Sequence, residues 1–325
     1  MPVMLGQSMA FTVACAQLRR YAGCDVPVLI EGETGTGKEL AAREIHYGSA
    51  RRERPFIPIN CGAIADNLIE NELFGHERGA YTDAKSVQRG LIDHARGGTL
   101  FLDEVDALSG KAQVALLRFL ENSEYRPVGG GTIRVSDARI ISATNSCLEQ
   151  RVAAGCFRSD LQYRLNALRV RLPPLRERAD DVPLLAEHFV GVVAQRLRGP
   201  MKHWSLDALQ ALAAYAWPGN VRELENVVLR AYLCTEGAII ELDAAELAFS
   251  VPDAAIGPVI DGAKDSFIAA KHHAIRAFEF RYLSQLMRRA GGNVSAAARM
   301  SGTERRQLGR LLKKHGIETD QFRSE

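Results

Sequence analysis

The sequence predicts an α/β fold with a mostly parallel sheet, followed by a small helical domain and a basic helical block. Three observations predict this order. Short apolar runs alternate with longer amphipathic stretches from Val26 to about Asn145, strand patterns end after about Arg178, and positive charge gathers near the C-terminal end. Because strands that alternate with helices form a parallel sheet covered on both faces, we expect that architecture in the first part of the chain.

Apolar patterning places the elements of the sheet. Four runs bounded by glycine, proline or charge have the pattern of buried strands: Val28–Ile30, Phe56–Ile59, Thr99–Leu102 and Arg139–Thr144. Between them, Glu39–Tyr47 and Lys111–Glu121 have apolar residues at helical spacing. No segment repeats at a fixed period, which argues against a solenoid.

Helix patterns dominate the chain after Arg178. Three stretches have them: Val182–Leu197, Ser205–Ala216 and Asn220–Thr235. Ser205 is a good helix start, and Trp217-Pro-Gly219 must interrupt the helices before Asn220 caps the next one. The predicted domains are an α/β core at 1–175, a helical domain at 176–248, a linker at 249–265 and a last helical domain at 266–325.

Composition and charge narrow the class of protein. The 325 residues are 46% hydrophobic and 25% charged, which is usual for globular domains and excludes a disordered or fibrous chain. No apolar run reaches the roughly 18 residues that span a bilayer, and residues 1–20 lack a signal peptide's apolar core, so we expect a cytoplasmic protein. Residues 271–325 carry a net charge of +7 within a chain of net +2. A basic end on an acidic body indicates a nucleic-acid-binding module.

The six cysteines form no pattern of metal ligands. They are scattered, with no Cys-x-x-Cys pair and no histidine at zinc-finger spacing: Cys15, Cys24, Cys61, Cys147, Cys156 and Cys234. We therefore expect them to be buried as small hydrophobic residues.

A glycine-rich loop follows the first predicted strand and opens a predicted helix. Its residues are Gly32, Glu33, Thr34, Gly35, Thr36, Gly37, Lys38 and Glu39. In that context the pattern predicts a nucleotide site, because backbone N–H groups and the helix N-terminus surround the phosphates and Lys38 reaches the β and γ phosphates. The alternative is a glycine-rich turn beside a surface lysine. Glu39 departs from the general pattern, which has a hydroxyl for Mg²⁺ at that position.

Two carboxylates at the end of the third predicted strand supply the second half of this site. Asp103 is predicted to hold Mg²⁺ through its water shell, and Glu104 to orient and deprotonate the attacking water. An acidic pair at a strand end is a weak signal alone. It becomes strong after a phosphate-binding loop in the same α/β domain.

The C-terminal block has the form of a helix-turn-helix. Asn293 or Ser295 can cap a first helix, Gly302 can make the turn, and Thr303 can cap a second helix. At 100° per residue Leu308, Leu311 and Leu312 share one face of that helix, opposite Arg306, Arg310 and Lys313. The residues predicted to contact double-stranded DNA are Thr303, Arg305, Arg306, Arg310, Lys313 and Lys314. A basic helix that is merely solvated is the alternative.

Residues 1–245 resemble AAA+ P-loop NTPases, and specifically the branch that activates the bacterial sigma factor sigma-54. The segment Glu72–Ala84, with Phe74 and Tyr81, carries this resemblance. The family's sigma-contacting loop usually reads Gly-Ala-Phe-Thr-Gly-Ala; the positions here are Gly79, Ala80, Tyr81, Thr82, Asp83 and Ala84. Asp83 in place of glycine adds a carboxylate to each copy of the loop. The alternative is a surface hairpin whose Tyr81 packs back on its own domain.

The resemblance implies roles for further residues. Asn60 matches the asparagine that holds the catalytic glutamate, and Thr144 with Asn145 matches the sensor of the γ phosphate. Arg158 and Arg164 match arginines donated to the neighbouring subunit's site, and Arg222 matches the lid's contact with the nucleotide. The terminal helices resemble the Fis-type module of the family, except that Gly309 stands where an aromatic residue is common.

The resemblance implies an ATP-driven transcriptional activator. We expect it to bind an upstream site as a dimer, assemble into a hexamer and remodel the closed complex of sigma-54 RNA polymerase holoenzyme. The AAA+ core begins almost at Met1, so we expect no receiver domain on this chain and control by other means, such as a separate regulatory protein. Because of Asp83, one alternative is a sigma-54-independent regulator whose AAA+ core serves oligomerisation or sensing. A remodeller of another protein is disfavoured by the helix-turn-helix.

Overall fold

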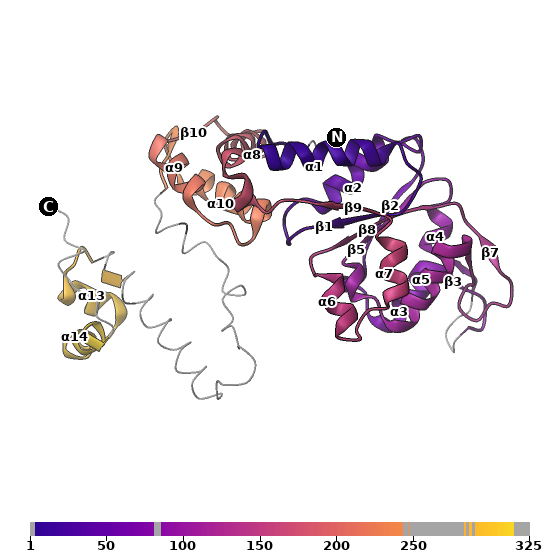
Figure 1. The fold of residues 1–325 in the computed structure, drawn as a ribbon. Coiled ribbons are helices and arrows are strands. Elements are labelled where there is room, and N and C mark those ends of the chain that lie inside the picture. Colours follow the sequence, from indigo (N-terminus) through magenta and orange to yellow (C-terminus); the bar gives the residue numbers. More distant parts are fainter. Residues whose placement is uncertain are drawn as a thin grey trace. The chain divides into compact units, whose positions relative to one another are not determined.

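A computed structural model describes residues 4–80, 86–242 and 290–314, together with the single positions Leu247, Leu283, Leu286 and Met287 (Figure 1). The chain divides into two compact units, Met1–Ser250 and Val251–Glu325, and each is considered by itself below. Residues 81–84 of the predicted sigma-contacting loop and the predicted linker at 249–265 lie outside the described residues.

The first unit is built on a five-stranded parallel sheet. Its spatial order is β2-β5-β8-β1-β9. The strands are β1 (Val28–Glu31), β2 (Phe56–Asn60), β5 (Thr99–Asp103), β8 (Arg139–Thr144) and β9 (Leu168–Arg171). The four predicted strands are confirmed. The fifth, β9, was not predicted: it is an edge strand that alternates leucine or valine with arginine, and only Val170 is buried, so it forms no apolar run.

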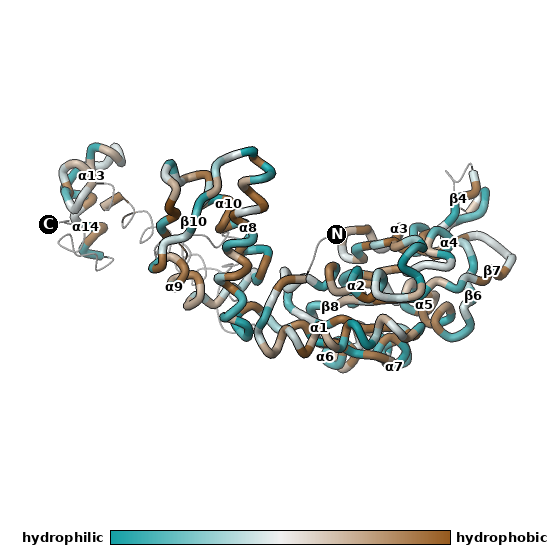
Figure 2. The backbone as a smooth tube through the Cα atoms, turned by 90° about the horizontal axis from the view of Figure 1, so that it is seen from above, coloured by the Kyte–Doolittle hydropathy of each residue, from teal (hydrophilic) through white to brown (hydrophobic). Residues whose placement is uncertain are grey.

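Helices cover both faces of the sheet, as the sequence predicts (Figure 1). Val28 and Ile30 of β1 face one core and Leu29 faces the other, because side chains alternate along a strand. One face carries α1 (Met9–Ala22) and α2 (Lys38–Tyr47). The other carries α3 (Asp66–Phe74), α4 (Leu91–His94), α5 (Gly110–Asn122), α6 (Leu148–Ala153) and α7 (Ser159–Leu165). Hydrophobic and hydrophilic residues interchange within these helices, which gives each a buried and a solvent face (Figure 2).

Short elements complete the α/β part. They are the 3₁₀ turns η1 (Cys61–Ala63) and η2 (Val105–Ala107), and the strands β3 (Gly75–His76), β4 (Gln88–Arg89), β6 (Glu124–Tyr125) and β7 (Arg134–Val135). Phe74, which belongs to the segment Glu72–Ala84 that carries the family resemblance, is part of the core and not of an exposed loop. Phe74 ends α3, is only 2% exposed and packs near the ring of Tyr125, with the centroids 6.3 Å apart.

A helical lid completes the first unit. It comprises η3 (Leu175–Asp181), α8 (Val182–Leu197), β10 (His203–Trp204), α9 (Leu206–Ala214), α10 (Asn220–Cys234) and β11 (Ile239–Ile240). The Ser205 hydroxyl accepts from the Ala208 N–H at 3.2 Å, which confirms the predicted helix start. Asn220 does not cap α10, contrary to the prediction. It lies inside the helix start with φ 52°, and its side chain points to the phosphate-binding loop instead.

The C-terminal unit contains the two predicted helices, α13 (Val294–Ser301) and α14 (Arg305–Lys314). Asn293 caps α13, because its side chain accepts from the N–H groups of Ser295 and Ala296. Gly302 makes the turn in the left-handed region, at φ 65°. The predicted cap at Thr303 is one residue off, since α14 begins at Arg305 and the Thr303 hydroxyl donates back to the carbonyl of Ser301.

The cysteine prediction is mostly wrong. Cys61 is buried, Cys15 is half-buried and the other four are exposed; all six thiols are free. Within the described residues no cluster of three or more histidine, cysteine, aspartate or glutamate side chains could hold a metal ion. No helix within the described ranges is long and apolar enough to cross a membrane.

Candidate nucleotide site, lid and DNA-binding helix

The phosphate-binding loop joins β1 to α2 in a conformation that depends on glycine. Gly35 and Gly37 have φ values of 81° and 95°, which other residues rarely adopt. The loop closes on itself, because the Lys38 ammonium donates to the carbonyl oxygens of Gly32 at 2.8 Å and Glu33 at 3.1 Å. Burial lowers the pKa of Lys38, while the Asp103 and Glu104 carboxylates oppose that shift. This loop can receive phosphate at the N-terminus of a ten-residue helix.

Glu39 takes no part in the loop's interior. Its carboxylate pairs with Arg43 one turn along α2, with 2.7 Å between Oε1 and Nη2. The pair lies on the exposed side of the helix. Position 39 thus has no hydroxyl to bind a metal ion, and the Glu39 carboxylate that replaces it is held by Arg43.

The acidic pair lies where the sequence places it, at the carboxyl end of β5. Burial raises the pKa of the Asp103 carboxyl, and the Lys38 ammonium opposes this shift. Glu104 has left-handed backbone geometry, with φ 53°. Its carboxylate packs against Gly62, where an added Cβ atom would collide with Oε2. Asp103 and Glu104 thus lie at the carboxyl edge of the sheet, the same edge at which Lys38 follows β1.

Asn60 lies beside the acidic pair because β2 and β5 are parallel and Asn60 is the register partner of Asp103. Its side-chain oxygen accepts from the N–H groups of Gly62 at 2.8 Å and Ala63 at 3.0 Å. The asparagine therefore shapes the η1 turn that contacts Glu104. Between the side chains of Asn60 and Glu104 the structure has no hydrogen bond, so the two are neighbours held through the turn.

Asn145 reaches the phosphate-binding loop from the end of β8. Its Nδ2 donates to the Thr34 hydroxyl oxygen at 3.1 Å. The flanking residues are tied to Asp106, a buried carboxylate that the sequence reasoning did not single out. The sequence around Asp106 does not indicate its partners, because Thr144 and Ser146 lie 38 and 40 residues further along the chain.

The lid contacts the loop directly through the start of α10. Asn220 Nδ2 donates to the Thr34 carbonyl oxygen at 3.0 Å and to Glu33 Oε2 at 3.2 Å. The Val221 N–H donates to the Gly35 carbonyl oxygen at 3.0 Å. Arg222 follows on the exposed side, and its charge helps to lower the pKa of Lys38. The structure therefore brings the predicted lid arginine and the predicted loop together.

A second connection between lid and loop is an ion pair. Arg176 of η3 donates through both terminal nitrogens to the two carboxylate oxygens of Glu33, at 2.8 and 2.6 Å. Its guanidinium holds the pKa of the Glu33 carboxyl below its usual value. Since a bidentate pair fixes orientation as well as distance, Glu33 links the loop to the lid.

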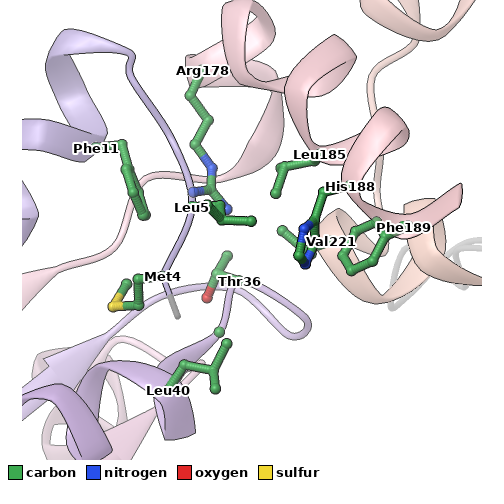
Figure 3. A pocket seen from close by; sticks show the side chains of 11 residues that line it. Met4, Leu5, Phe11, Thr36, Leu40, Arg178, Leu185, His188, Phe189 and Val221 are labelled. Atoms are coloured by element: carbon green, nitrogen blue, oxygen red, sulfur yellow. The ribbon is translucent and has the colours of Figure 1, made fainter. Parts of the chain in front are cut away.

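A pocket of about 180 Å³ opens between the loop and the lid (Figure 3). Its wall is mostly apolar and comes from three parts of the chain: Met4, Leu5 and Phe11 near the N-terminus, Thr36, Gly37 and Leu40 of the loop and α2, and Arg178, Leu185, His188, Phe189 and Val221 of the lid. The sequence reasoning missed this pocket, because no local pattern connects segments so far apart.

The N-terminal segment is fastened to the lid by a buried carboxylate. Asp181 accepts from the N–H groups of Gln7 at 2.6 Å and Ser8 at 2.8 Å, and from the Ser8 hydroxyl. The Arg178 guanidinium lies over the Phe11 ring, 4.7 Å from its centroid. These contacts hold one wall of the pocket in place.

The predicted trans-acting arginines lie away from the loop of their own chain. Arg158 pairs with Asp160 at 2.6 Å and Arg164 with Glu121 at 3.7 Å, and both arginines are exposed. Within the described ranges neither forms a hydrogen bond or an ion pair with the phosphate-binding loop. Gln113 positions the start of α7, because its side-chain oxygen accepts from the Arg158 N–H at 2.9 Å.

The base of the predicted sigma-contacting loop is tied to the segment between β6 and β7. Glu77 N–H donates to the Val128 carbonyl oxygen at 3.0 Å, and Val128 N–H donates to the Gly75 carbonyl oxygen at 2.8 Å. Arg134 pairs with Glu77 at 2.6 Å and with Asp93 at 3.3 Å. Gly79, at φ 82°, and Ala80 belong to this base; the other four predicted loop residues lie outside the described ranges.

Helix α14 has the two faces that the sequence predicts. Leu308 and Leu312 are buried against α13, and Leu311 packs partly against the same core. The basic residues on the remaining surface are exposed: Arg305, Arg306, Arg310, Lys313 and Lys314. The helix therefore presents a positive face suited to a DNA groove.

Three protein-family models match the chain. The sigma-54 interaction domain matches residues 4–171, the AAA+ ATPase lid domain matches residues 176–252, and the model for bacterial regulatory proteins of the Fis family matches residues 274–315.

Curated relatives match over most of the chain. It is 41% identical over 310 residues to the transcriptional regulatory protein GlrR of Escherichia coli strain K12, a match that covers 94% of this chain and 66% of that protein. It is 43% identical over 314 residues to the phenol regulator MopR of Acinetobacter guillouiae, covering 95% and 56%. The chain thus spans less than two thirds of the length of these relatives.

Solved structures match as well. The crystal structure of NtrX from Brucella abortus in complex with ATP is 35% identical, with a TM-score of 0.69, and the match covers 98% of this chain and 70% of that one. The complex of the same protein with ADP matches with a TM-score of 0.68 and 34% identity, over 97% of this chain and 69% of that one.

Proposed function

The chain belongs to the sigma-54 interaction family of AAA+ ATPases and carries a Fis-type helix-turn-helix, and on this premise we propose that it uses ATP hydrolysis to open promoters held by sigma-54 RNA polymerase. The observation that carries the proposal is the junction of lid and loop, where Asn220 and Val221 contact the loop that would hold the phosphates. Such a junction lets the state of the nucleotide set the position of the lid.

The residues at the loop fit ATP with Mg²⁺. Lys38 offers a cation, and Asp103 offers a carboxylate at the same edge of the sheet. The pocket lined by Leu5, Phe189 and Val221 offers an apolar place for the base of the nucleotide. Mg²⁺ would neutralise phosphate charge, held through water by Asp103 since Glu39 is occupied by Arg43. Glu104 would orient the attacking water and accept its proton, with Asn60 shaping the turn beside it.

Assembly would complete the site. Arg158 and Arg164 are exposed, and each pairs with an acidic side chain whose place a phosphate could take. An arginine supplied by an adjacent subunit stabilises charge on the transferred phosphoryl group, so hydrolysis would depend on a ring, which we expect to be a hexamer. Arg222 would report the nucleotide's state to the lid.

The sigma-contacting loop would transmit the resulting motion. Its base is tied to the β6–β7 segment through Glu77 and Val128, which gives the loop a fixed attachment to the α/β core. Asp83 favours a second candidate function, because a carboxylate buried against a protein partner costs several kcal/mol unless it is paired. In that case the chain regulates transcription without sigma-54, and its AAA+ core serves oligomerisation or sensing.

In vitro transcription separates the two candidates. Purified protein, upstream DNA and either sigma-54 or housekeeping holoenzyme are combined with ATP or with a non-hydrolysable analogue. We expect open complexes only with sigma-54 holoenzyme and ATP, and none with the Glu104→Gln variant. Activation of housekeeping holoenzyme, or equal activation with the analogue, would favour the sigma-54-independent regulator. If the wild-type protein opens no promoter and the Asp83→Gly variant does, Asp83 prevents the loop from engaging sigma-54.

A further inference from the structure

Asp106 is a buried carboxylate between the two halves of the candidate hydrolysis site. It lies in η2, two residues after Glu104, and is only 9% exposed. No cation pairs with its carboxylate within the described ranges. A buried carboxylate is unfavourable unless hydrogen bonds satisfy it, so Asp106 depends on its hydrogen-bond partners.

Both carboxylate oxygens accept hydrogen bonds from the residues that flank Asn145. Thr144 Oγ1 donates to Oδ1 at 2.6 Å, and Ser146 Oγ donates to Oδ2 at 2.7 Å. Asp106 therefore holds the loop of residues 144–146 by hydrogen bonds on both sides of Asn145. The backbone of Asp106 is fixed as well, because Arg151 Nη2 donates to its carbonyl oxygen at 2.9 Å.

The hydroxyls of Thr144 and Ser146 both lie closer to the Asp106 carboxylate than to their other acceptors. Each hydroxyl has one proton, and both have a second acceptor nearby: the Ser146 carbonyl oxygen at 3.3 Å for Thr144 and Asn145 Oδ1 at 3.2 Å for Ser146. Because the bonds to the carboxylate are the shorter ones, we assign both protons to them. Ser146 N–H then donates to Thr144 Oγ1 at 3.0 Å, which closes the loop around Asn145.

Asn145 is the part of this loop that touches the phosphate-binding loop. Its Nδ2 donates to Thr34 Oγ1 at 3.1 Å. The orientation of its carboxamide depends on Thr144 and Ser146, and these depend on Asp106. Glu104 depends on the same turn, because Ala107 N–H donates to the Glu104 carbonyl oxygen at 2.9 Å.

We propose that Asp106 is a positioning residue for ATP hydrolysis: its carboxylate holds the Thr144–Ser146 loop against the turn that carries Glu104, so that Asn145 and Glu104 approach the γ phosphate with a fixed separation. This role rests on the proposed ATPase function. Asp106 touches neither nucleotide nor water in it. A displacement of about 1 Å at a reacting group can lower a rate by up to about 100-fold, so the carboxylate acts on turnover more than on binding.

Two substitutions on opposite sides of one hydrogen bond test the role. Asp106→Asn keeps the shape of the side chain and removes the charge, and Ser146→Ala removes one donor at a partly buried position. We expect each to lower kcat on the order of 10-fold while the Kd for a fluorescent ATP analogue changes by less than about twofold. Because both substitutions disturb the contact between residues 106 and 146, the double variant should lose less than the sum of the two single losses.

Asp137→Asn is the matched control. Asp137 lies just before the opposite end of β8, and its carboxylate accepts from the Gly97 N–H at 2.7 Å. The control should keep wild-type kcat. Thermal unfolding of each variant shows whether a lower kcat reflects lost stability. The proposal is overturned if both variants lose nucleotide binding and kcat equally, or if kcat is unchanged in both.

ATP hydrolysis by the wild-type protein separates a failure of the Asp106 role from a failure of the proposed function. If Asp106→Asn does not fold, Ser146→Ala alone decides, through the same split between kcat and Kd. A wild-type protein that binds but does not hydrolyse ATP would overturn the proposed function and this role together. Wild-type hydrolysis with normal turnover in the two variants would overturn only the role of Asp106.

Discussion

Asn220 at the start of α10 donates a hydrogen bond to the Thr34 carbonyl oxygen at 3.0 Å, so that a side chain of the lid contacts the backbone of the phosphate-binding loop. The same side chain accepts from the Leu175 N–H at 2.7 Å. It therefore connects the loop, the first turn of the lid and α10 at a single buried point. Asparagine also tolerates the left-handed backbone found here better than most residues.

We predict that Asn220→Ala weakens nucleotide binding and lowers lid stability. It leaves the buried Leu175 N–H without a partner, which costs about 1–3 kcal/mol, and removes the bond to the loop. Calorimetric titration with ATP and chemical unfolding measure the two effects. Asn220→Gly suits the positive φ but also loses the side chain, so it should behave similarly. Asn122→Ala, at an exposed asparagine of α5, should change neither quantity. Normal affinity in both Asn220 variants would mean that the lid does not need this contact.

The Asn220 contact shows what sequence reasoning could not supply. The sequence marks residue 220 as a helix start, yet its partner Thr34 is 186 residues away, and no local pattern reports such a pair. By contrast, the loop and the strand end at Asp103 were predictable, because each depends on a glycine, an apolar run or a charge within a few neighbouring residues. Strand β9 was missed for a local reason, since an edge strand buries only one face and needs no apolar run.

Asp103 provides a prediction for stability against pH. Burial raises the pKa of its carboxyl in the folded protein above the unfolded value, so the folded state binds this proton more tightly. The stabilisation that follows is complete below the unfolded pKa and is lost as the pH rises through the folded pKa. At neutral pH the ionised carboxylate is therefore unfavourable. We predict that Asp103→Asn unfolds at a higher temperature than the wild type at pH 7.5 without nucleotide.

The predicted difference should shrink as the pH falls from 7.5 towards 4, because wild-type Asp103 then takes up its proton. Thermal unfolding of both proteins across that range measures it. Asp137→Asn should show the opposite sign, since the Gly97 N–H holds the pKa of that carboxyl below its usual value. A difference for Asp103→Asn that is independent of pH would show that ionisation is not its cause.

The trans-acting arginines can be tested by mixing inactive subunits. Arg158→Ala and Glu104→Gln should each abolish ATP hydrolysis. If the arginine acts on the neighbouring site, a mixed ring contains interfaces with an intact Glu104 on one side and an intact Arg158 on the other. With random equimolar mixing we expect about a quarter of wild-type ATPase activity to return. Steady-state phosphate release measures it.

Mixing Lys38→Ala with Glu104→Gln is the matched control. Both residues belong to the site of one subunit, so no combination restores a complete site and the mixture should stay inactive. Restored activity in this control would point to a contaminating ATPase or to a site that takes Lys38 and Glu104 from different subunits. A mixture of Arg158→Ala with Glu104→Gln that stays inactive, although mixed rings form, would place Arg158 outside the trans interaction. The same pair of mixtures with Arg164→Ala assigns the second arginine.

Arg306 and Arg310 should carry much of the affinity for DNA. Both lie on the exposed face of α14, opposite the buried Leu308 and Leu312. We predict that replacing both arginines by alanine lowers DNA affinity and reduces the slope of log K against log salt concentration by about 2, if both contact phosphates. Fluorescence anisotropy at several salt concentrations measures the slope. Lys111→Ala with Arg196→Ala removes equal charge from the first unit and should leave the slope unchanged.

Gly309 offers a prediction for the stability of the recognition helix itself. It lies in the middle of α14, and an added Cβ atom would meet nothing within 4 Å. Because alanine loses less backbone entropy than glycine on forming a helix, we predict that Gly309→Ala stabilises the C-terminal unit by about 0.5–1 kcal/mol. Hydrogen exchange of the α14 amides in the full chain measures the change. Gly302→Ala is the counterpart: the turn requires φ 65°, so the same side chain should lower protection there by a comparable amount. Equal effects at the two glycines would mean that backbone conformation does not govern either. If Gly309→Ala raises protection yet weakens DNA binding, the glycine serves a close approach of the helix to DNA, which would explain why an aromatic residue is absent at this position.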